Sequence, residues 1–295
     1  MKAAASRSLA SLNLKLSLLS RFESTMAELN TARQELSAKT KELEKTRTEL
    51  NVTRRLLAPT VLSKLNASGH PPSIRQPPIS QIFISDGKGG PGKLLQNCIG
   101  SVQGCFPGSE HRLYAGEEID DFISRYYDKD VLACFRSLKP FAYKADLARL
   151  CILAAKGGWY IDVGITWVVP IVFPKSIRLF TMRDRNDYCK SSWACNNAII
   201  YSQEKHPALI RGIELIVENY KSNYYGKTSL CPTGPNVWGK AVAAKCDPGE
   251  TLFGDICELT PRHAVKNLAY VTEEGVIIAF AKPSQGGDGL VAFGE

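Results

Sequence analysis

The chain has 295 residues, of which 44% are hydrophobic, and a formal net charge of +8. The hydrophobic share excludes a disordered chain, and the length allows one large domain or two small ones. Because the sequence has no run of about 18 apolar residues, we expect no membrane-spanning helix.

The first 58 residues carry most of the positive charge. They hold eleven Lys or Arg against six Glu, a balance of +5. Such a basic arm can contact anionic surfaces such as lipid headgroups, although a solvated helix face is the simpler interpretation. The arm has no interleaved aromatic residues and no known reading motif, so we expect no nucleic acid partner.

The first twenty residues and the cysteines bear on where the protein is located. Ser and Asn interrupt the apolar residues of this stretch, which makes it too polar for a secretory signal, while an organellar transit peptide stays open as an alternative. The nine cysteines include no Cys-x-x-Cys pair, and their odd number favours reduced thiols. We therefore expect a cytoplasmic protein, with peripheral contact at the inner face of the membrane as a further expectation.

Hydrophobic residues recur every seven positions and predict a coiled-coil-like helix over about 20–57. Arg33, Arg47 and Arg54 occupy the second core position of the repeat, so we expect weak pairing. The regular spacing still favours a homo-oligomer formed through residues 22–57 over a lone helix. The repeat consists of Phe22, Leu29, Leu36, Leu43, Leu50 and Leu57.

Prolines mark the end of this helix and the start of a second region. Pro59 stops the helix, and four further prolines up to residue 78 predict a stiff linker. We therefore expect a basic arm with a heptad helix over 1–58, a Pro-rich linker over 59–78 and a folded domain over 79–295.

Strand and helix patterns alternate from residue 79 onward. This alternation predicts an α/β domain with a mostly parallel sheet that is covered on both faces. The expected elements are a strand at 79–85, a helix from about 93, a helix at 141–156, strands at 159–163, 176–181 and 197–202, a helix at 206–220 and a strand at 276–281.

Two acids and an arginine are the candidate functional residues. Asp162 lies at the end of a predicted strand, and ligands of open parallel sheets collect beyond the carboxyl ends of strands. A carboxylate there can hold a divalent cation between two phosphates. Asp146 and Arg149 are neighbours on one helix face and can contact a ribose, a base or a phosphate. Taken singly, a solvated acid and an intrahelical ion pair are the simpler interpretations.

The surrounding motif makes a functional interpretation stronger. Residues 145–150 read ADLARL, and residues 157–162 read GGWYID. An Asp-x-x-Arg helix, a Gly-Gly turn, an aromatic residue and an Asp in this order resemble the signature of DXD sugar-binding glycosyltransferases, family 32 and the capsular polysaccharide synthesis proteins. The resemblance covers about 79–285, with supporting agreement at Ile82–Ile84, Asn196–Ile200, His206–Pro207 and Thr233–Pro235.

The resemblance implies a GT-A-like fold and a hexosyltransferase-like enzyme, of the retaining kind. Its substrates would be a nucleoside-diphosphate sugar and a glycan or glycoconjugate acceptor, as in polysaccharide biosynthesis. It names no catalytic residue. The residues that it assigns to the nucleotide sugar are Asp146, Arg149, Gly158, Tyr160, Asn197, Thr233 and Gly234.

The resemblance also implies a Mn²⁺ or Mg²⁺ ion on Asp162. The second Asp of the family motif is replaced, because Val163 and Gly164 follow Asp162. Asp288 or His263 can supply the missing ligand. A catalytically degenerate domain that binds a sugar nucleotide, and acts as a scaffold or assembly subunit through the coiled-coil arm, is the alternative function.

Two other patterns in the sequence suggest different kinds of binding site. Residues 87–93 read GKGGPGK, close to a phosphate-binding P-loop, but Leu94 stands where a Ser or Thr should contact Mg²⁺. Tyr220, Tyr224 and Tyr225 form an aromatic cluster for which packing is favoured over a sugar-binding platform.

Overall fold

A computed structural model describes most of the chain and divides it into two units, 1–60 and 61–295, which are treated separately below. The described residues are 21–45 without 23 and 44, and 76–281 without 87–88, 172, 186–188, 190 and 259–267. Within these residues, none of the helices combines the length and apolar character needed to cross a bilayer.

The first unit contains one described helix, which runs over residues 21–43 with residue 23 outside the description. Leu29, Leu36 and Leu43 of the seven-residue repeat lie on it and are exposed. Residues 46–57 of the expected helix and residues 59–75 of the expected linker lie outside the described residues. The formation of a coiled coil therefore stays a prediction.

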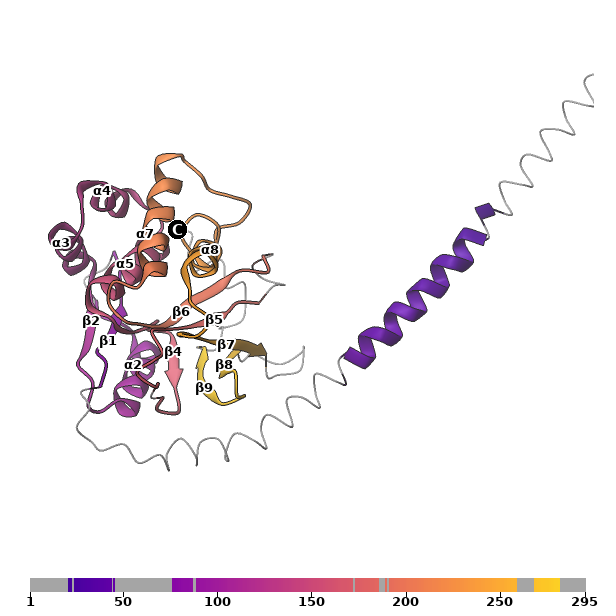
Figure 1. Ribbon diagram of the computed structural model, residues 1–295, viewed down its shortest axis with the longest axis horizontal. Coiled ribbons are helices and arrows are strands. Elements are labelled where there is room, and N and C mark those ends of the chain that lie inside the picture. The colour runs from indigo at the N-terminus through magenta and orange to yellow at the C-terminus, as the bar shows by residue number, and fades with distance from the viewer. Residues whose placement is uncertain are drawn as a thin grey trace, which may run out of the picture. The chain divides into compact units, whose positions relative to one another are not determined.

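The second unit is a mixed α/β fold built on a nine-stranded sheet in the order β2-β1-β3-β6-β5-β7-β8-β9-β4 (Figure 1). The strands are β1 (Ile79–Ile82), β2 (His111–Tyr114), β3 (Gly158–Ile161), β4 (Ile165–Trp167), β5 (Leu179–Arg183), β6 (Cys195–Ser202), β7 (Thr251–Glu258), β8 (Leu268–Thr272) and β9 (Ile277–Ala281).

The expectation of a mostly parallel sheet was wrong. Only the pairs β1/β2, β1/β3 and β5/β7 are parallel. Strand β6 runs antiparallel between β3 and β5, and β7, β8, β9 and β4 pair antiparallel in turn. Parallel neighbours need a long crossover connection, whereas antiparallel neighbours can follow each other through a short turn. Strands β8 and β9 are antiparallel neighbours joined by a short turn at Glu273 and Glu274.

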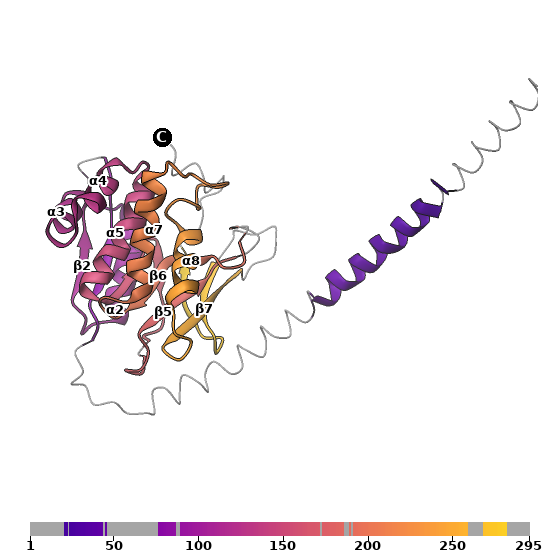
Figure 2. The same cartoon turned by 45° about the horizontal axis from the view of Figure 1, so that its top comes forward.

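Helices cover both faces of this sheet, as expected. Helices α5, α7 and α8 lie side by side on one face (Figure 2), and α2 lies across the sheet from them, against β4 (Figure 1). The helices are α2 (Lys93–Cys105), α3 (Gly116–Tyr126), α4 (Lys129–Ser137), α5 (Phe141–Lys156), α7 (Pro207–Lys221) and α8 (Pro235–Lys245).

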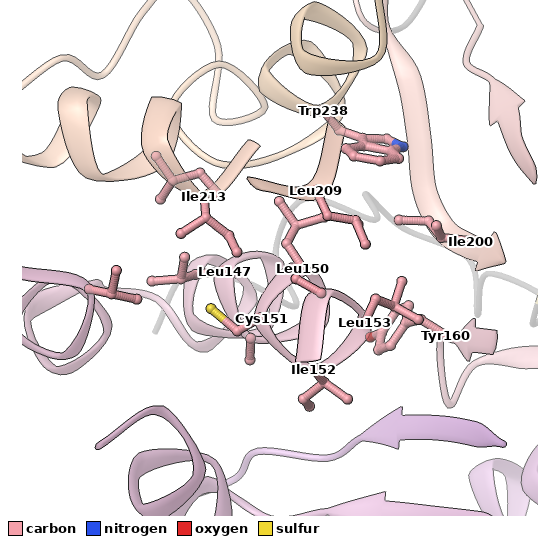
Figure 3. Packing of buried hydrophobic residues seen from close by; sticks show 14 of the residues in the cluster. Leu147, Leu150, Cys151, Ile152, Leu153, Tyr160, Ile200, Leu209, Ile213 and Trp238 are labelled. Atoms are coloured by element: carbon pink, nitrogen blue, oxygen red, sulfur yellow. The ribbon is translucent and has the colours of Figure 1, made fainter. Parts of the chain in front are cut away.

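Helix α5 is the centre of the main core. All residues from Asp146 to Ala154 are buried, because the helix lies between the sheet and α7. Leu150 and Leu209 meet in this core, and Trp238 of α8 lies beside them (Figure 3). A methyl group at Gly212 would lie 2.8 Å from the Leu150 side chain, so a larger residue there would have to displace this buried leucine.

The Gly-Gly turn after α5 leads the chain back into the sheet. Gly157 and Gly158 have φ angles of 61° and 89°, which side chains with a Cβ rarely adopt. A Cβ at Gly158 would also collide with the carbonyl oxygen of Pro78. The turn therefore directs β3 toward the sheet edge at which Asp162 lies.

Candidate active site

The candidate site lies where β3 ends, beside the middle of α5 and the first residues of β6. Asp162 is the first residue after β3, and its backbone N–H donates to the carbonyl of Ala198. Asn197 of β6 is one residue away along that strand. Antiparallel pairing of β3 with β6 thus brings the Asp162 and Asn197 side chains to one edge, with α5 above them.

Asp146 and Arg149 form a buried ion pair on α5. The Asp146 Oδ1 atom lies 3.0 Å from Nη2 of Arg149 and accepts a hydrogen bond of 2.8 Å from the Asn197 amide. Its Oδ2 atom accepts a 2.9 Å hydrogen bond from the Thr233 hydroxyl. The carboxylate therefore has donors from three segments, which together compensate for its burial.

Arg149 connects this buried carboxylate to the one at the strand end. Its Nη1 atom lies 3.3 Å from Asp162 Oδ1 and donates a 2.6 Å hydrogen bond to the Asn197 carbonyl. Its Nε atom donates to the Ala145 carbonyl, and its guanidinium carbon lies 4.6 Å from the centre of the Tyr160 ring. Only a planar guanidinium can satisfy so many partners at once.

Asp162 is more exposed to solvent than the other two charged residues of this network. The side chains of Arg149 and Asp146 are 6% and 12% exposed, whereas that of Asp162 is 37% exposed. The Tyr160 hydroxyl donates to Asp162 Oδ1 and orients it. Asp162 is therefore the carboxylate of this network that a ligand from solvent can reach most easily.

Burial and charge set the ionisation of the network. Burial raises the pKa of Asp146, while Arg149, Thr233 and Asn197 favour its ionised form. Burial disfavours the charged guanidinium of Arg149, but the carboxylates of Asp162 and Asp146 help to outweigh this and raise its pKa. Because arginine stays protonated in proteins, the guanidinium keeps its positive charge between the two carboxyl groups.

The structure brings most of the predicted site residues together. Asp146, Arg149, Tyr160, Asp162, Asn197 and Thr233 form the network described above. Gly234 lies against it, because a Cβ there would be 3.5 Å from Asp146 Oδ2.

One predicted residue is not part of this network, and two others lie outside the described residues. Gly158 lies at the opposite end of β3, where it pairs with Ser202, and its requirement for glycine comes from Pro78. Asp288 and His263 lie outside the described residues. Among the residues that are described, no group of three or more His, Cys, Asp or Glu side chains can hold a metal ion.

Sequence reasoning missed a second polar group at the same edge of the sheet. Asp184 follows β5, and its Oδ2 atom accepts a 3.3 Å hydrogen bond from the Asn196 amide. Burial, and then the charges of Asp162 and Asp184, raise the pKa of Tyr270 on β8. The strand was predicted at 176–181, which ends three residues before Asp184, so the sequence did not mark Asp184 as a strand-end residue as it did Asp162. The sequence around Tyr270 carried no signal either.

Solved structures that are similar to this chain include two glycosyltransferases. The PaToxG glycosyltransferase is 19% identical, with a TM-score of 0.47, over 65% of this chain and 80% of that one. A glycosyltransferase involved in the glycosylation of the major capsid of PBCV-1 is 14% identical, with a TM-score of 0.30, over 61% of this chain and 82% of that one. No family model and no curated protein sequence matches the chain. Because both similarities are distant, the functional proposal rests on the geometry of the site.

Proposed function

We propose that this protein is a glycosyltransferase that transfers a sugar from a nucleoside-diphosphate sugar to a glycan or glycoconjugate acceptor. The observation that supports the proposal is the continuous network from buried Asp146 through Arg149 to exposed Asp162. This network combines hydrogen-bonding groups suited to sugar hydroxyls with a carboxylate at the surface. The residue order of the glycosyltransferase signature falls on the same side chains.

In this proposal the inner residues of the network bind and orient the donor. Asp146 and Arg149 contact the nucleotide sugar, with Asn197, Thr233 and Gly234 beside them and Tyr160 behind the guanidinium. Because these side chains are held by one another and by α5 and β6, little conformational entropy is lost when a ligand binds. We expect a hexosyl donor and retention of configuration, as in the family that the motif resembles.

The charge of the site supports a requirement for a cation. The Asp162 carboxylate and a diphosphate are both acidic groups and repel each other when ionised, so a cation between them makes binding favourable. Carboxylate oxygen is a suitable ligand for Mg²⁺ and Mn²⁺, and Mg²⁺ is often bound through one or two carboxylates together with substrate phosphates and water. Asp162 would hold this ion, and Asp288 or His263 is proposed as its second ligand. When bound, the cation neutralises the negative charge that builds up on a departing diphosphate.

The contacts that Asp162 already makes within the protein favour a second candidate function. Its Oδ1 atom already accepts from Tyr160 and faces Arg149, and Val163 replaces the second acid of the motif. A domain of this kind can bind a sugar nucleotide without turning it over. It would then act as a scaffold or assembly subunit, with the helix near the N-terminus providing homo-oligomer contacts and the basic arm providing contact with the inner face of the membrane.

Nucleotide-sugar turnover with and without Mn²⁺ separates the two functions. We expect the wild-type protein to hydrolyse or transfer sugar from one class of nucleoside-diphosphate sugar only with the metal. Asp162→Asn should abolish this turnover, while the control Asp121→Asn, at an exposed acid on α3, should leave it unchanged. Tight donor binding without turnover in the wild type would instead favour the scaffold. Turnover that persists in Asp162→Asn would contradict the role proposed for Asp162.

A further inference from the structure

A cavity adjoins the candidate site at Thr233. Its volume is about 180 Å³, and it lies between the end of α4, the last turns of α7 and the segment before α8. Thr233 belongs to both places, because it lines the cavity and its hydroxyl donates to Asp146. Tyr143 also lines the cavity, and it precedes Asp146 by three residues on α5, so the two side chains are neighbours on that helix.

Tyrosine rings form much of the wall of this cavity. Tyr143, Tyr220, Tyr224 and Tyr225 all line it. Tyr220, Tyr224 and Tyr225 are 36%, 44% and 69% exposed, so their rings are not buried in the core. The aromatic cluster noted in the sequence therefore presents ring surface to solvent at the mouth of a cavity.

Hydrogen bonds fix the position of this wall. The Tyr220 hydroxyl donates a 3.1 Å hydrogen bond to the Ser137 hydroxyl, which connects α7 to the end of α4. The Asn219 amide donates a 2.9 Å hydrogen bond to the Pro232 carbonyl, which connects α7 to the segment that carries Thr233. The cavity is thus formed before any ligand binds, and little ordering is needed on binding.

The chemistry of the wall matches a pyranose ring. The faces of aromatic rings carry partial negative charge and attract the C–H groups on one face of a sugar, while amide and hydroxyl groups hydrogen-bond with its hydroxyls. Asn219 and Asn223 provide the amides here. Among the described residues that line the cavity, Lys139 is the only one with a formal charge, so the cavity suits a neutral or acidic sugar.

The size of the cavity fits a small ligand. Pockets that enclose drug-sized ligands measure roughly 300–1,000 Å³, and this cavity, at about 180 Å³, is smaller. Its space matches one sugar unit and does not enclose a whole nucleotide sugar.

From these observations we infer that the tyrosine-walled cavity binds a pyranose unit of the acceptor, next to the donor sugar at Asp146. The inference rests on the proposed glycosyltransferase function and specifies a carbohydrate as the acceptor. It makes Tyr224 and Tyr225 binding residues for the acceptor with no contact to the donor.

Saturation-transfer NMR of the full chain with methyl glucopyranoside, galactopyranoside and mannopyranoside tests this inference. We expect at least one of them to bind the wild-type protein. In the double variant Tyr224→Ala/Tyr225→Ala its dissociation constant should rise at least about tenfold, because two ring faces are lost. Tyr224→Phe/Tyr225→Phe, which keeps the rings, should retain most of the binding. Tyr126→Ala, at a tyrosine of similar exposure on α3, should bind as the wild type does.

Donor binding, measured in parallel as the melting-temperature shift with nucleotide sugars and Mn²⁺, separates this inference from the proposed function. An unchanged donor shift with lost glycoside binding in the double alanine variant supports the acceptor cavity. Glycoside binding that is absent in the wild type, or unchanged in the double alanine variant, overturns it and leaves the donor site standing. Loss of the donor shift in the double alanine variant also overturns it, since the cavity would then serve the donor. If no nucleotide sugar raises the melting temperature of the wild type, the glycosyltransferase proposal fails, and the acceptor role fails with it.

Discussion

Asp146 and Arg149 are charged residues inside an otherwise apolar helix environment. An isolated charge in such a place is costly, and a buried ion pair is tolerated only when hydrogen bonds satisfy its remaining atoms. Here Thr233 and Asn197 supply those bonds to the carboxylate, and the carbonyls of Asn197 and Ala145 supply them to the guanidinium. The arrangement is costly to build for stability alone, which is why we assign it a role in binding.

Removal of the Thr233 hydroxyl should therefore destabilise the protein. Thr233→Val keeps the size of the side chain but deletes a donor to a buried carboxylate, and we expect the free energy of unfolding to fall by about 1–3 kcal/mol. Urea denaturation measures this change. Thr251→Val is the matched control, because Thr251 is buried and its hydroxyl has no hydrogen-bond partner in the described structure. An equal loss of stability in both variants would show that the Thr233–Asp146 bond has no special importance.

Helix α7 begins with a histidine that links its stability to pH. The Nδ1 atom of His206 accepts a 3.2 Å hydrogen bond from the Ala208 N–H, which only an unprotonated nitrogen can do. Burial, and then the charge of Arg178, lower the pKa of His206 below its ordinary value of 6.5, although Glu250 acts in the opposite direction. The folded protein therefore binds fewer protons here than the unfolded chain at mildly acidic pH.

Stability should fall as the pH is lowered below about 6.5, by at most about 1.4 kcal/mol per pH unit for this one proton. Above that range the His206 contribution should be constant. His206→Asn keeps a side chain that can cap the helix and should show a shallower slope in denaturation curves collected from pH 5 to 8. Part of the slope should persist in that variant, because burial also lowers the pKa of His111. An identical slope in wild type and variant would refute the cap assignment.

The helix over residues 21–43 presents exposed leucines that a second copy can cover. Leu36 is 68% exposed in the repeat, and Leu36→Lys should weaken self-association of the full chain. Sedimentation equilibrium measures this as a lower average mass at equal concentration. Ser37→Lys is the control, since it adds the same charge one position away from the repeat. A wild-type protein that is monomeric at all concentrations would contradict the proposed homo-oligomer.

At the scale of the whole molecule, the sequence predicted individual helices and strands better than it predicted how distant strands pair. The helix at 141–156 coincides with α5, and α2 and α7 begin within one residue of their expected starts, because periodicity and glycine or proline boundaries mark them. The predicted direction of the strands was wrong, since β6 pairs antiparallel both with the preceding strand β5 and with β3, which is more distant in the chain. Helices α3, α4 and α8, and strands β2, β4, β7 and β8, were not foreseen.

The candidate site shows the same division between local and distant information. The spacing of Asp146, Arg149 and Asp162 placed them on adjoining elements, and the structure brings them into contact. Their roles in binding stay predictions. Tyr270 comes from β8, far along the chain, and nothing in its local sequence indicated that it lies near Asp162 and Asp184.

The most direct test of the account is whether the intact protein binds a nucleotide sugar through Asp162 and a cation. UDP-, GDP- and CMP-sugars, each with and without Mn²⁺, should be screened for their effect on the melting temperature. At about a hundredfold excess over its dissociation constant a ligand stabilises the folded state by about 2.7 kcal/mol, or roughly 5–10 °C for a domain of this size. We predict such a rise for one class of nucleoside-diphosphate sugar, UDP or GDP, only with Mn²⁺, and its loss in Asp162→Asn. No rise with any of them, or a rise of equal size without the metal and in the variant, would contradict the account.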